Sequence, residues 1–478
     1  MPQLNHKTIG LILGPCLMAT IWLSEPPKDL SIEAWRVAGI ACLMGVWWAT
    51  EAIPLVATAL LPMALGPLMG ILPAKEMSLA YASPTIYLLL GGFIVALGLE
   101  RWNLHKRIAL NVLIKAGQKP GTIIGGFMLA TALLSMWISN TASTLMMIPI
   151  ALSIASVIAP KYDTNFDHRN YTTVLLLGVA YAASIGGVGT LIGTAPNILV
   201  AGYLYEAYGI EISFATWAMF GLPMVAILLP AAWFLLTKLI FPVRLPSNSA
   251  AQNFIASSLQ ELGQISRPER RMLTIFICVA LSWMFRSFLN QIPGLENLSD
   301  TAIALIGALA LFIIPSGDGS PLMTWGWAKR LPWDVLLLYG GSIALASIVS
   351  STGLGAWLGD HLLPFTLWPE LALIALIVIV VLLLTELLNN SATVAAFLPV
   401  LGALADARDM DPIMLALPTA LAASCAFMLP VATPPNTIVF GTGRITLGSM
   451  VRGGAGLNML AIIFIPFTVY ALMPYLMM

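Results

Sequence analysis

Long apolar segments, separated by short polar ones, recur along the whole of this 478-residue chain. Runs of about 18 or more apolar residues are long enough to cross the hydrocarbon core of a bilayer as helices. Pro, Gly and charged clusters between the runs set the expected helix ends. The pattern predicts apolar helices over 8–23, 34–50, 53–72, 84–100, 121–137, 141–159, 172–204, 213–242, 271–290, 300–315, 333–350, 367–388, 391–406, 412–442 and 452–476. We therefore expect an all-α polytopic membrane protein.

Two of these apolar regions carry a polar cluster. Ser139–Pro149 reads SNTASTLMMIP and Asn389–Pro399 reads NNSATVAAFLP, so in each an Asn precedes a small hydroxyl residue and Ala, and a Pro follows nine residues after the Asn. Two more regions are interrupted by Pro and Gly, which break the helical hydrogen-bond ladder. The interruptions read GGVGTLIGTAPN, within 172–204, and PVATPPN, within 412–442.

We expect each polar cluster to form the tip of a re-entrant hairpin, one at 121–159 and one at 367–406. Eleven other spans then remain. With the N-terminus in the cytoplasm, 17 of the 22 Lys and Arg residues fall in cytoplasmic loops. This asymmetry favours that orientation, because cytoplasmic loops are enriched in Lys and Arg. Treating the hairpins as pairs of full spans gives the same orientation, so the charges do not distinguish the two arrangements.

Three blocks of sequence recur in the same order in the two halves of the chain. YLLLGGFIVALGL resembles LLLYGGSIALASI, Asn140 recurs as Asn390 at an offset of 250, and Asn197 recurs as Asn436 at an offset of 239. Such ordered repetition indicates an internal duplication. An odd number of crossings separates equivalent points, so the second half is expected to be inverted. Inverted repeats with interrupted helices are typical of secondary transporters, whose site lies at the repeat interface.

The same pattern divides the chain into five parts. The one long polar stretch is expected to be a cytoplasmic linker between the halves. The parts are 1–83, N-terminal scaffold spans; 84–242, the first inverted repeat with hairpin 121–159 and interrupted helix 172–204; 243–271, the linker; 272–332, connecting scaffold spans; and 333–478, the second inverted repeat with hairpin 367–406 and interrupted helix 412–442.

Composition supports the membrane class and excludes others. Hydrophobic residues make up 59% and charged residues 9% of the chain, whereas soluble domains carry about 25% charged residues. The formal net charge is zero, which gives no indication of a nucleic-acid partner. The four cysteines lie in apolar segments without paired spacing, so we expect neither a disulfide nor a metal site. The spans hold no constellation of His, Asp, Glu and Cys, so we expect no enzyme and no catalytic residues.

The polar clusters are suited to bind an anion. Backbone N–H groups at the start of a returning helix, together with its dipole, attract negative charge. Two such tips could hold two carboxylates or one tetrahedral dianion. The side chains that add donors are Ser139, Asn140 and Thr141 in the first half, and Asn389, Asn390 and Ser391 in the second.

The same regions offer oxygen ligands for a cation such as Na⁺. The interrupted helices free backbone carbonyls, and Ser135 and Ser139 share a helix face, as do Thr385 and Asn389. Neither region contains Lys, Arg or His. Because a buried dianion without a compensating charge is costly, we expect bound cations to couple anion uptake to a sodium gradient. For Glu386, beside Thr385, a structural hydrogen-bonding role and the handling of a proton or cation both remain open.

Five motifs resemble the divalent anion:sodium symporter (DASS) family, and the resemblance covers nearly the whole chain. They are TEAIPLVATALLP at 50–62, SNT at 139–141, GTAPN at 193–197, TELLNNSAT at 385–393 and ATPPN at 432–436. Many members carry Ser-Asn-Thr in both halves, whereas the second copy here is Asn389-Asn390-Ser391. The resemblance implies a homodimer in which a transport domain moves against a scaffold domain as an elevator.

The resemblance also implies two sodium sites and one substrate site between the tips. The first sodium site would use Ser135, Ser139, Asn140 and Gly193, and the second Thr385, Leu388, Asn390 and Ala432. The substrate would contact Ser139, Asn140, Thr141, Thr194, Asn390, Ser391, Thr433 and Pro434.

Sodium-coupled symport of a C4 dicarboxylate of the succinate or malate class is the leading functional hypothesis. The protein would lie in the plasma (inner) membrane, with a small divalent organic anion, sodium ions and the lipid bilayer as its partners. Sodium-independent dicarboxylate exchange, and symport of sulfate or another divalent anion, are the alternatives. An anion channel could use similar helix ends.

Overall fold

The structure is a computed structural model that describes residues 6–158, 166–247, 249–361 and 368–472. Across these ranges the regular secondary structure is helical, without a named strand. Seven of the helices are long and apolar enough to cross a membrane, and five shorter apolar helical stretches accompany them. The predicted all-α polytopic fold is confirmed.

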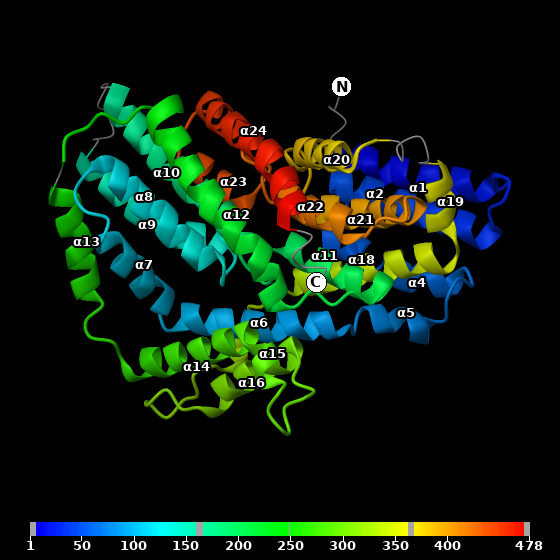
Figure 1. The fold of residues 1–478 in the computed structure, drawn as a ribbon, viewed down its shortest axis with the longest axis horizontal. Helices are drawn as coiled ribbons and strands as arrows, with labels where there is room; N and C mark the ends of the chain where they lie inside the picture. Colours follow the sequence, from blue (N-terminus) through cyan, green and yellow to red (C-terminus); the bar gives the residue numbers. More distant parts are fainter. Residues whose placement is uncertain (1–5, 159–165, 248, 362–367, 473–478) are drawn as a thin grey trace.

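Residues 6–83 form a group of helices at one end of the elongated molecule (Figure 1). They are α1 (His6–Leu23), α2 (Ile32–Thr50), α3 (Leu55–Thr58), α4 (Leu61–Leu68) and α5 (Ala74–Ala80). The prediction of one continuous helix over 53–72 is wrong, because α3 and α4 are separate. Pro62 explains the break: it has no N–H to donate to the carbonyl of Thr58, and its ring crowds that carbonyl.

The first repeat has its breaks close to the predicted positions. Its helices are α6 (Pro84–Arg101), α7 (Leu104–Ile114), α8 (Pro120–Ser135), α9 (Asn140–Ile158), α10 (Phe166–Gly187), α11 (Ala195–Tyr208) and α12 (Phe214–Phe234), which continues as the π-helix η1 (Leu235–Ile240). α8 has 16 residues and so spans about 24 Å. This is shorter than the hydrocarbon core of about 30 Å, as one arm of a hairpin should be.

The second repeat follows the same order. Its helices are α18 (Trp333–Ser351), α19 (Leu354–His361), α20 (Glu370–Thr385), α21 (Asn390–Ala407), α22 (Ile413–Ala423), α23 (Pro434–Gly441) and α24 (Leu447–Leu472). The predicted hairpin ends at 159 and 367, and the last residues of the predicted helix 452–476, lie outside the described residues.

The segment between the repeats is more helical than the sequence indicated. It contains α13 (Ser249–Glu261), α14 (Arg267–Met284), α15 (Arg286–Leu289), α16 (Asp300–Ile313) and α17 (Trp325–Ala328). Helix α13 was not predicted within the polar linker 243–271. α14 begins four residues before the predicted 271, because Ser266 and Glu269 form a capping box in which each side chain accepts the other residue's backbone N–H.

The recurring glycine pairs mark two close helix contacts. An added Cβ at Gly91 would lie 2.7 Å from the Cβ of Ala304, where α6 packs on α16. An added Cβ at Gly341 would lie 2.1 Å from the carbonyl oxygen of Ala59, where α18 packs against α3 and α4. One glycine of each pair therefore allows a neighbouring backbone to approach.

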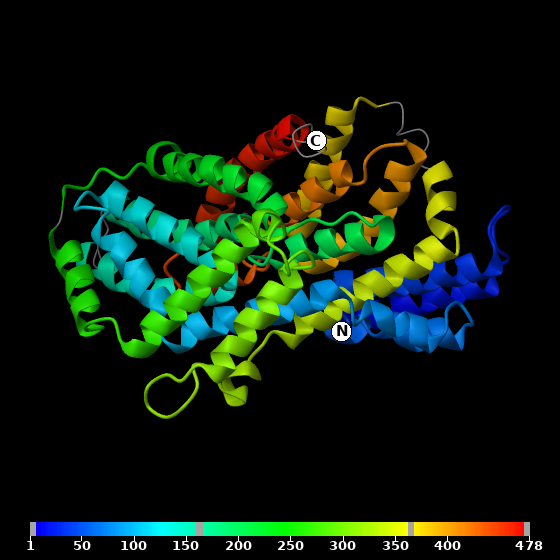
Figure 2. The same cartoon turned by 60° about the horizontal axis from the view of Figure 1, so that its bottom comes forward.

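The hairpin of each repeat packs against the interrupted helix of the other repeat. α9, the returning helix of the first hairpin, packs against α23 of the second half, and α21, the returning helix of the second hairpin, packs against α11 of the first half. Figures 1 and 2 show α8, α9, α10 and α12 together at the end of the molecule opposite α1 and α2. This reciprocal packing brings both hairpins and both interrupted helices to the interface between the halves.

Candidate functional site

The first hairpin tip is held by a side-chain hydrogen bond across its turn. α8 ends at Ser135 and α9 begins at Asn140, and the Ser135 hydroxyl donates to Oδ1 of Asn140 at 2.5 Å. Asn140 also lies against Gly187 at the end of α10, where an added Cβ would be 2.5 Å from that same oxygen. The contact joins the hairpin to the first interrupted helix, and only glycine leaves room for it.

The second tip repeats this arrangement 250 residues later. The Thr385 hydroxyl donates to Oδ1 of Asn390 at 2.7 Å, and it also reaches the carbonyl oxygen of Ala423 at 3.2 Å. Ala423 is the last residue of α22, so this hydroxyl links the second hairpin to the second interrupted helix. A hydroxyl and an amide oxygen therefore stand together at each tip.

Asn389 takes the capping role that Ser139 has in the first half. The Ser139 hydroxyl accepts the N–H of Ala142 at 3.2 Å. Oδ1 of Asn389 accepts the N–H groups of Ser391 and Ala392 at 3.0 and 3.4 Å. Asn and Ser are both favoured N-cap residues, so the departure from Ser-Asn-Thr preserves the cap of the returning helix.

One buried asparagine stabilises each helix break. The side-chain amides of Asn197 and Asn436 each donate to two backbone carbonyls, located ten and seven residues earlier. The acceptors are Gly187 at 3.0 Å and Thr190 at 2.8 Å in the first half, and Ala426 at 3.2 Å and Leu429 at 3.0 Å in the second. All three pairs of equivalent positions differ by 239, the offset read from the sequence. The duplication is thus visible in the hydrogen bonds themselves.

Asn197 and Asn436 were predicted only as markers of the repeat and were not among the predicted site residues. Both are fully buried, and Oδ1 of each has no hydrogen-bond partner among the described residues. A buried amide oxygen without a donor is costly and is also a suitable ligand for a hard cation. The signal that could have identified them is the repeated Pro-Asn that follows each break.

Glu386 organises the second break. Its carboxylate accepts the backbone N–H groups of Phe427, Met428 and Leu429 at 2.8–3.0 Å, and the side-chain amide of Asn458 at 2.7 Å. All four partners are donors, as an ionised carboxylate requires. The residue is 5% exposed. Of the two roles left open by the sequence, the structural hydrogen-bonding role is confirmed.

The first half has no carboxylate at the equivalent position. Met136 stands there, offset from Glu386 by 250; its backbone carbonyl accepts the Thr190 hydroxyl and its side chain packs beside Gly189. The two breaks are therefore braced by asparagines in the same way but differ in charge.

The predicted substrate residues all lie at helix N-termini or hairpin tips. Asn140 and Thr141 begin α9, Asn390 and Ser391 begin α21, and Pro434 begins α23. Ser139, Thr194 and Thr433 occupy the positions just before α9, α11 and α23. Ser139 and Pro434 are exposed, Thr433 is buried, and the other five are partly buried. The N-termini of α9, α11 and α21 thus carry exposed or partly buried donors, whereas α23 begins with two prolines and follows a buried threonine.

The structure brings together most of the predicted cation ligands. In the first set, Ser135 and Asn140 are hydrogen-bonded, and Asn140 and Gly193 both lie against Gly187. In the second, Thr385 and Asn390 are hydrogen-bonded. The remaining members are placed less directly: Ser139 caps α9, Ala432 donates its N–H to the carbonyl of Leu429, and Leu388 lies in the turn between α20 and α21, where the described contacts join it to none of the other predicted ligands.

Comparison with known sequences identifies the family of this chain. The profile of the family described as the sodium:sulfate symporter transmembrane region matches residues 5–478. The chain belongs to this family. It is 41% identical to the sodium-dependent dicarboxylate transporter SdcS of Staphylococcus saprophyticus, over 98% of this chain and 92% of the relative. It is also 41% identical to SdcS of Staphylococcus aureus, over 98% of this chain and 91% of the relative. Family membership makes it an integral, multi-pass membrane transport protein.

Solved structures share the fold of this family member. The YdaH transporter of Alcanivorax borkumensis superposes with a TM-score of 0.56 at 14% identity, over 98% of each chain. MtrF of Neisseria gonorrhoeae superposes with a TM-score of 0.59 at 13% identity, over 95% of this chain and 96% of that one. At these identities the likeness concerns the fold alone.

Proposed function

We propose that this protein is a secondary active transporter that carries a C4 dicarboxylate of the succinate or malate class together with sodium ions. The observation that carries the proposal is the pair of equivalent tips, each with a hydroxyl bonded to the first asparagine of a returning helix. The relatives named sodium-dependent dicarboxylate transporters, at 41% identity over nearly the whole chain, support the same substrate and coupling ion.

The substrate carboxylates would bind at the helix N-termini. Backbone N–H groups and the helix dipole favour an anion there, and the helix starts at the two hairpins provide one such end for each carboxylate. The amides of Asn140 and Asn390 and the hydroxyls of Thr141 and Ser391 would add donors. None of the side chains hydrogen-bonded at the tips and breaks is basic, so the anion requires another source of positive charge.

Two sodium ions would supply that charge. The hydroxyl and amide oxygens at each tip, with the carbonyls of Gly193 in the first half and of Leu388 and Ala432 in the second, form oxygen-only ligand sets suited to a hard cation. The partnerless amide oxygens of Asn197 and Asn436 lie within each break and add to the oxygen available there. Sodium binding would therefore precede or accompany anion binding.

The proposal extends to the larger assembly. The helices before residue 84 and those over 272–332 would form a scaffold, against which the parts containing the hairpins and interrupted helices would move as an elevator. The protein would act as a homodimer in the plasma membrane with its N-terminus in the cytoplasm. The crossing of α9 to α23 and of α21 to α11 supports one moving unit built from both repeats.

The test is uptake of labelled succinate into proteoliposomes under an inward Na⁺ gradient, with K⁺ or choline as the replacement. We expect Na⁺-dependent, saturable uptake, with malate competing and sulfate competing weakly. Asn140→Ala and Asn390→Ala should each abolish uptake in folded protein, whereas Asn297→Ala, in an exposed loop, should not. Uptake that is unchanged in choline would contradict sodium coupling. Near-normal transport in both site variants would show that the site is elsewhere.

A further inference from the structure

A large apolar groove lies outside the site described above, beside α7 and α8. Its volume is about 750 Å³, within the range of pockets that bury a ligand of several hundred daltons. The apolar residues that line it include Leu104, Ile108 and Val112 of α7, Gly125 and Leu129 of α8, and Trp233 near the end of α12. The groove plays no part in the proposed transport chemistry.

The sequence of both walls explains why the groove is open. Along α7 the lining residues recur at intervals of three and four, which places them on one helix face. On α8 the facing positions include glycines: an added Cβ at Gly125 would lie 3.2 Å from Nε1 of Trp233. The Trp233 indole N–H donates to the carbonyl of Gly121 at 2.7 Å, which fixes the ring across the end of the groove.

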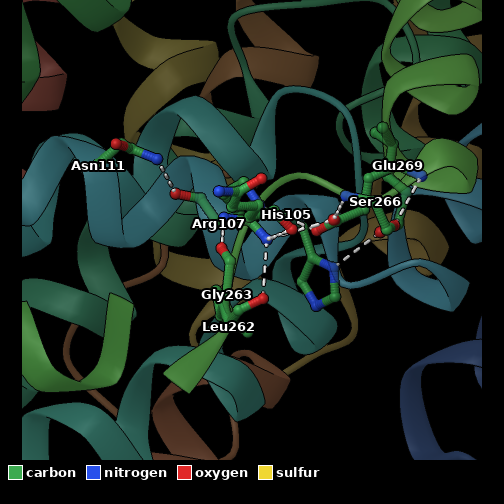
Figure 3. Close-up of polar contacts among 9 residues, drawn as sticks. His105, Arg107, Asn111, Leu262, Gly263, Ser266 and Glu269 are labelled. Carbon is green, nitrogen blue, oxygen red and sulfur yellow. Dashed lines mark hydrogen bonds and ion pairs between the residues drawn. The ribbon is translucent and has the colours of Figure 1, made fainter. Parts of the chain in front are cut away.

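Arg107 fixes α7 relative to the start of α14, so the wall is preformed (Figure 3). Its guanidinium pairs with Glu269 at 2.9 and 3.2 Å and donates to the carbonyls of Leu262 and Gly263 at 3.1 and 2.9 Å. The close-up shows Leu262, Gly263 and Glu269 around the Arg107 side chain. The guanidinium charge is therefore balanced by Glu269.

The rim of the groove carries one unbalanced positive charge. Of the five Lys and Arg residues within 101–119, only Arg107 and Lys115 line the groove, and Arg107 is paired with Glu269. Lys115 lines the groove, is exposed, and makes no ion pair among the described residues. Basic side chains beside an apolar cavity at the membrane surface attract anionic headgroups. Trp233 near the helix end is typical of the same interfacial level.

We propose that the groove binds one anionic phospholipid of the surrounding membrane, with its acyl chains against α7 and α8 and its phosphate beside Lys115. A water-soluble anion would leave the apolar walls uncovered, and a zwitterionic lipid would bring a second positive charge toward Lys115. The charge and the apolar lining together therefore select an acidic lipid. The site does not depend on which anion the protein transports.

Native mass spectrometry of detergent-purified protein tests the proposal, with phosphatidylglycerol and phosphatidylcholine of identical acyl chains as the probes. We expect one phosphatidylglycerol to be retained in preference to phosphatidylcholine. Lys115→Gln should lower the affinity for phosphatidylglycerol about fivefold, the effect of one basic residue near a headgroup. Lys75→Gln, which changes an exposed lysine of α5, should leave it unchanged.

Filling the groove gives a second, independent test. Leu129→Trp should prevent retention of the lipid, because Leu129 lines the groove, whereas Leu133→Trp should not. Leu133 lies one turn later on α8, is similarly exposed at 38% against 44%, and is not part of the lining. If Leu129→Trp is not monodisperse, Asn111→Trp at the exposed rim serves in its place. Equal retention of both lipids by the unaltered protein, or undiminished retention in the filled variants, would overturn the proposal.

Discussion

Glu386 offers the sharpest test of the proposed second sodium site. In Glu386→Gln, one carboxylate oxygen becomes an NH₂ group that faces backbone N–H donors of the second break. The variant loses one or two charge-assisted hydrogen bonds, each contributing about 1.5–3 kcal/mol, so we expect a cost of about 1.5–6 kcal/mol in the free energy of unfolding. Complete removal of the side chain in Glu386→Ala would leave four donors without this acceptor, two of them buried and two partly buried. At about 1–3 kcal/mol for each buried donor, the loss is a large fraction of the stability of a folded protein.

Glu386→Gln also removes a buried negative charge beside Thr385, a proposed sodium ligand. A unit charge about 10 Å from a cation contributes about 1.7 kcal/mol at an effective dielectric constant near 20. The four donors spread part of that charge, so we expect the half-saturating Na⁺ concentration for uptake to rise roughly tenfold. The assay is succinate uptake into proteoliposomes as a function of Na⁺, combined with a thermal unfolding curve for each variant.

Two further variants separate charge from architecture. Glu386→Asp keeps the charge but shortens the reach to the break, so it should lower stability while changing the Na⁺ requirement much less than Glu386→Gln does. Met136→Leu, at the uncharged equivalent position, should change neither. A folded Glu386→Gln protein that retains the original half-saturating Na⁺ concentration would refute a role for the charge, and so would equal shifts in the Gln and Asp variants.

Three other predictions follow from single contacts. Gly187→Ala should lower uptake more than tenfold, because the added Cβ would lie 2.5 Å from the hairpin amide oxygen, while Gly441→Ala, with nothing within 4 Å, should not. Asn389→Ala should cost about 1 kcal/mol of unfolding free energy through loss of the α21 cap, and Asn389→Ser should retain it. The pKa of Glu269 is lowered from 4.5, since hydrogen bonds from its arginine and serine partners outweigh the opposing effect of burial; its contribution to stability should therefore be complete at neutral pH and decline as the pH falls below 4.5 toward the lowered value.

Each of these three predictions can be contradicted by one measurement. Uptake by the Gly187→Ala and Gly441→Ala proteins can be compared at equal amounts of folded protein, and equal rates would exclude the close contact. Chemical or thermal unfolding in one detergent compares the Asn389 variants, where an Ala variant as stable as the Ser variant would exclude the cap. For Glu269, a melting temperature that rises on acidification from pH 7 to 4 would show the opposite sign of linkage.

Much of the fold could be predicted because membrane insertion and internal duplication both leave regular patterns in the amino-acid sequence. Apolar runs located the long helices, and the repeat offsets located the equivalent tips at Asn140 and Asn390. Short amphipathic helices were missed, α13 among them, because a polar segment that packs only a few residues, such as Ala251 and Ile255, has no long apolar run. The split between α3 and α4 leaves no signal in hydropathy, because Pro62 breaks the helical hydrogen-bond ladder without adding a polar side chain to the apolar run.

The site was predicted less completely, and the reason is the distance in sequence between partners. Hydroxyl and amide pairs within one tip are five residues apart, so their motif is visible. The partners of Glu386 lie 41–72 residues away, and no local pattern distinguishes a carboxylate that accepts backbone donors from one that carries a proton. Asn197 and Asn436 stood in a recurring motif, but their role depends on carbonyls that are free only once the helix is broken.

The contrast between Met136 and Glu386 sets a limit on the symmetry of the two halves. The braces at Asn197 and Asn436 use equivalent carbonyl acceptors in both breaks, and both tips present the same kind of hydroxyl–amide pair. Only the second half adds a buried carboxylate, and a negative charge attracts a cation more strongly than neutral oxygens do. If both proposed sodium sites exist, the second should therefore fill at the lower Na⁺ concentration. The order of binding would then follow from one residue that the duplication did not preserve.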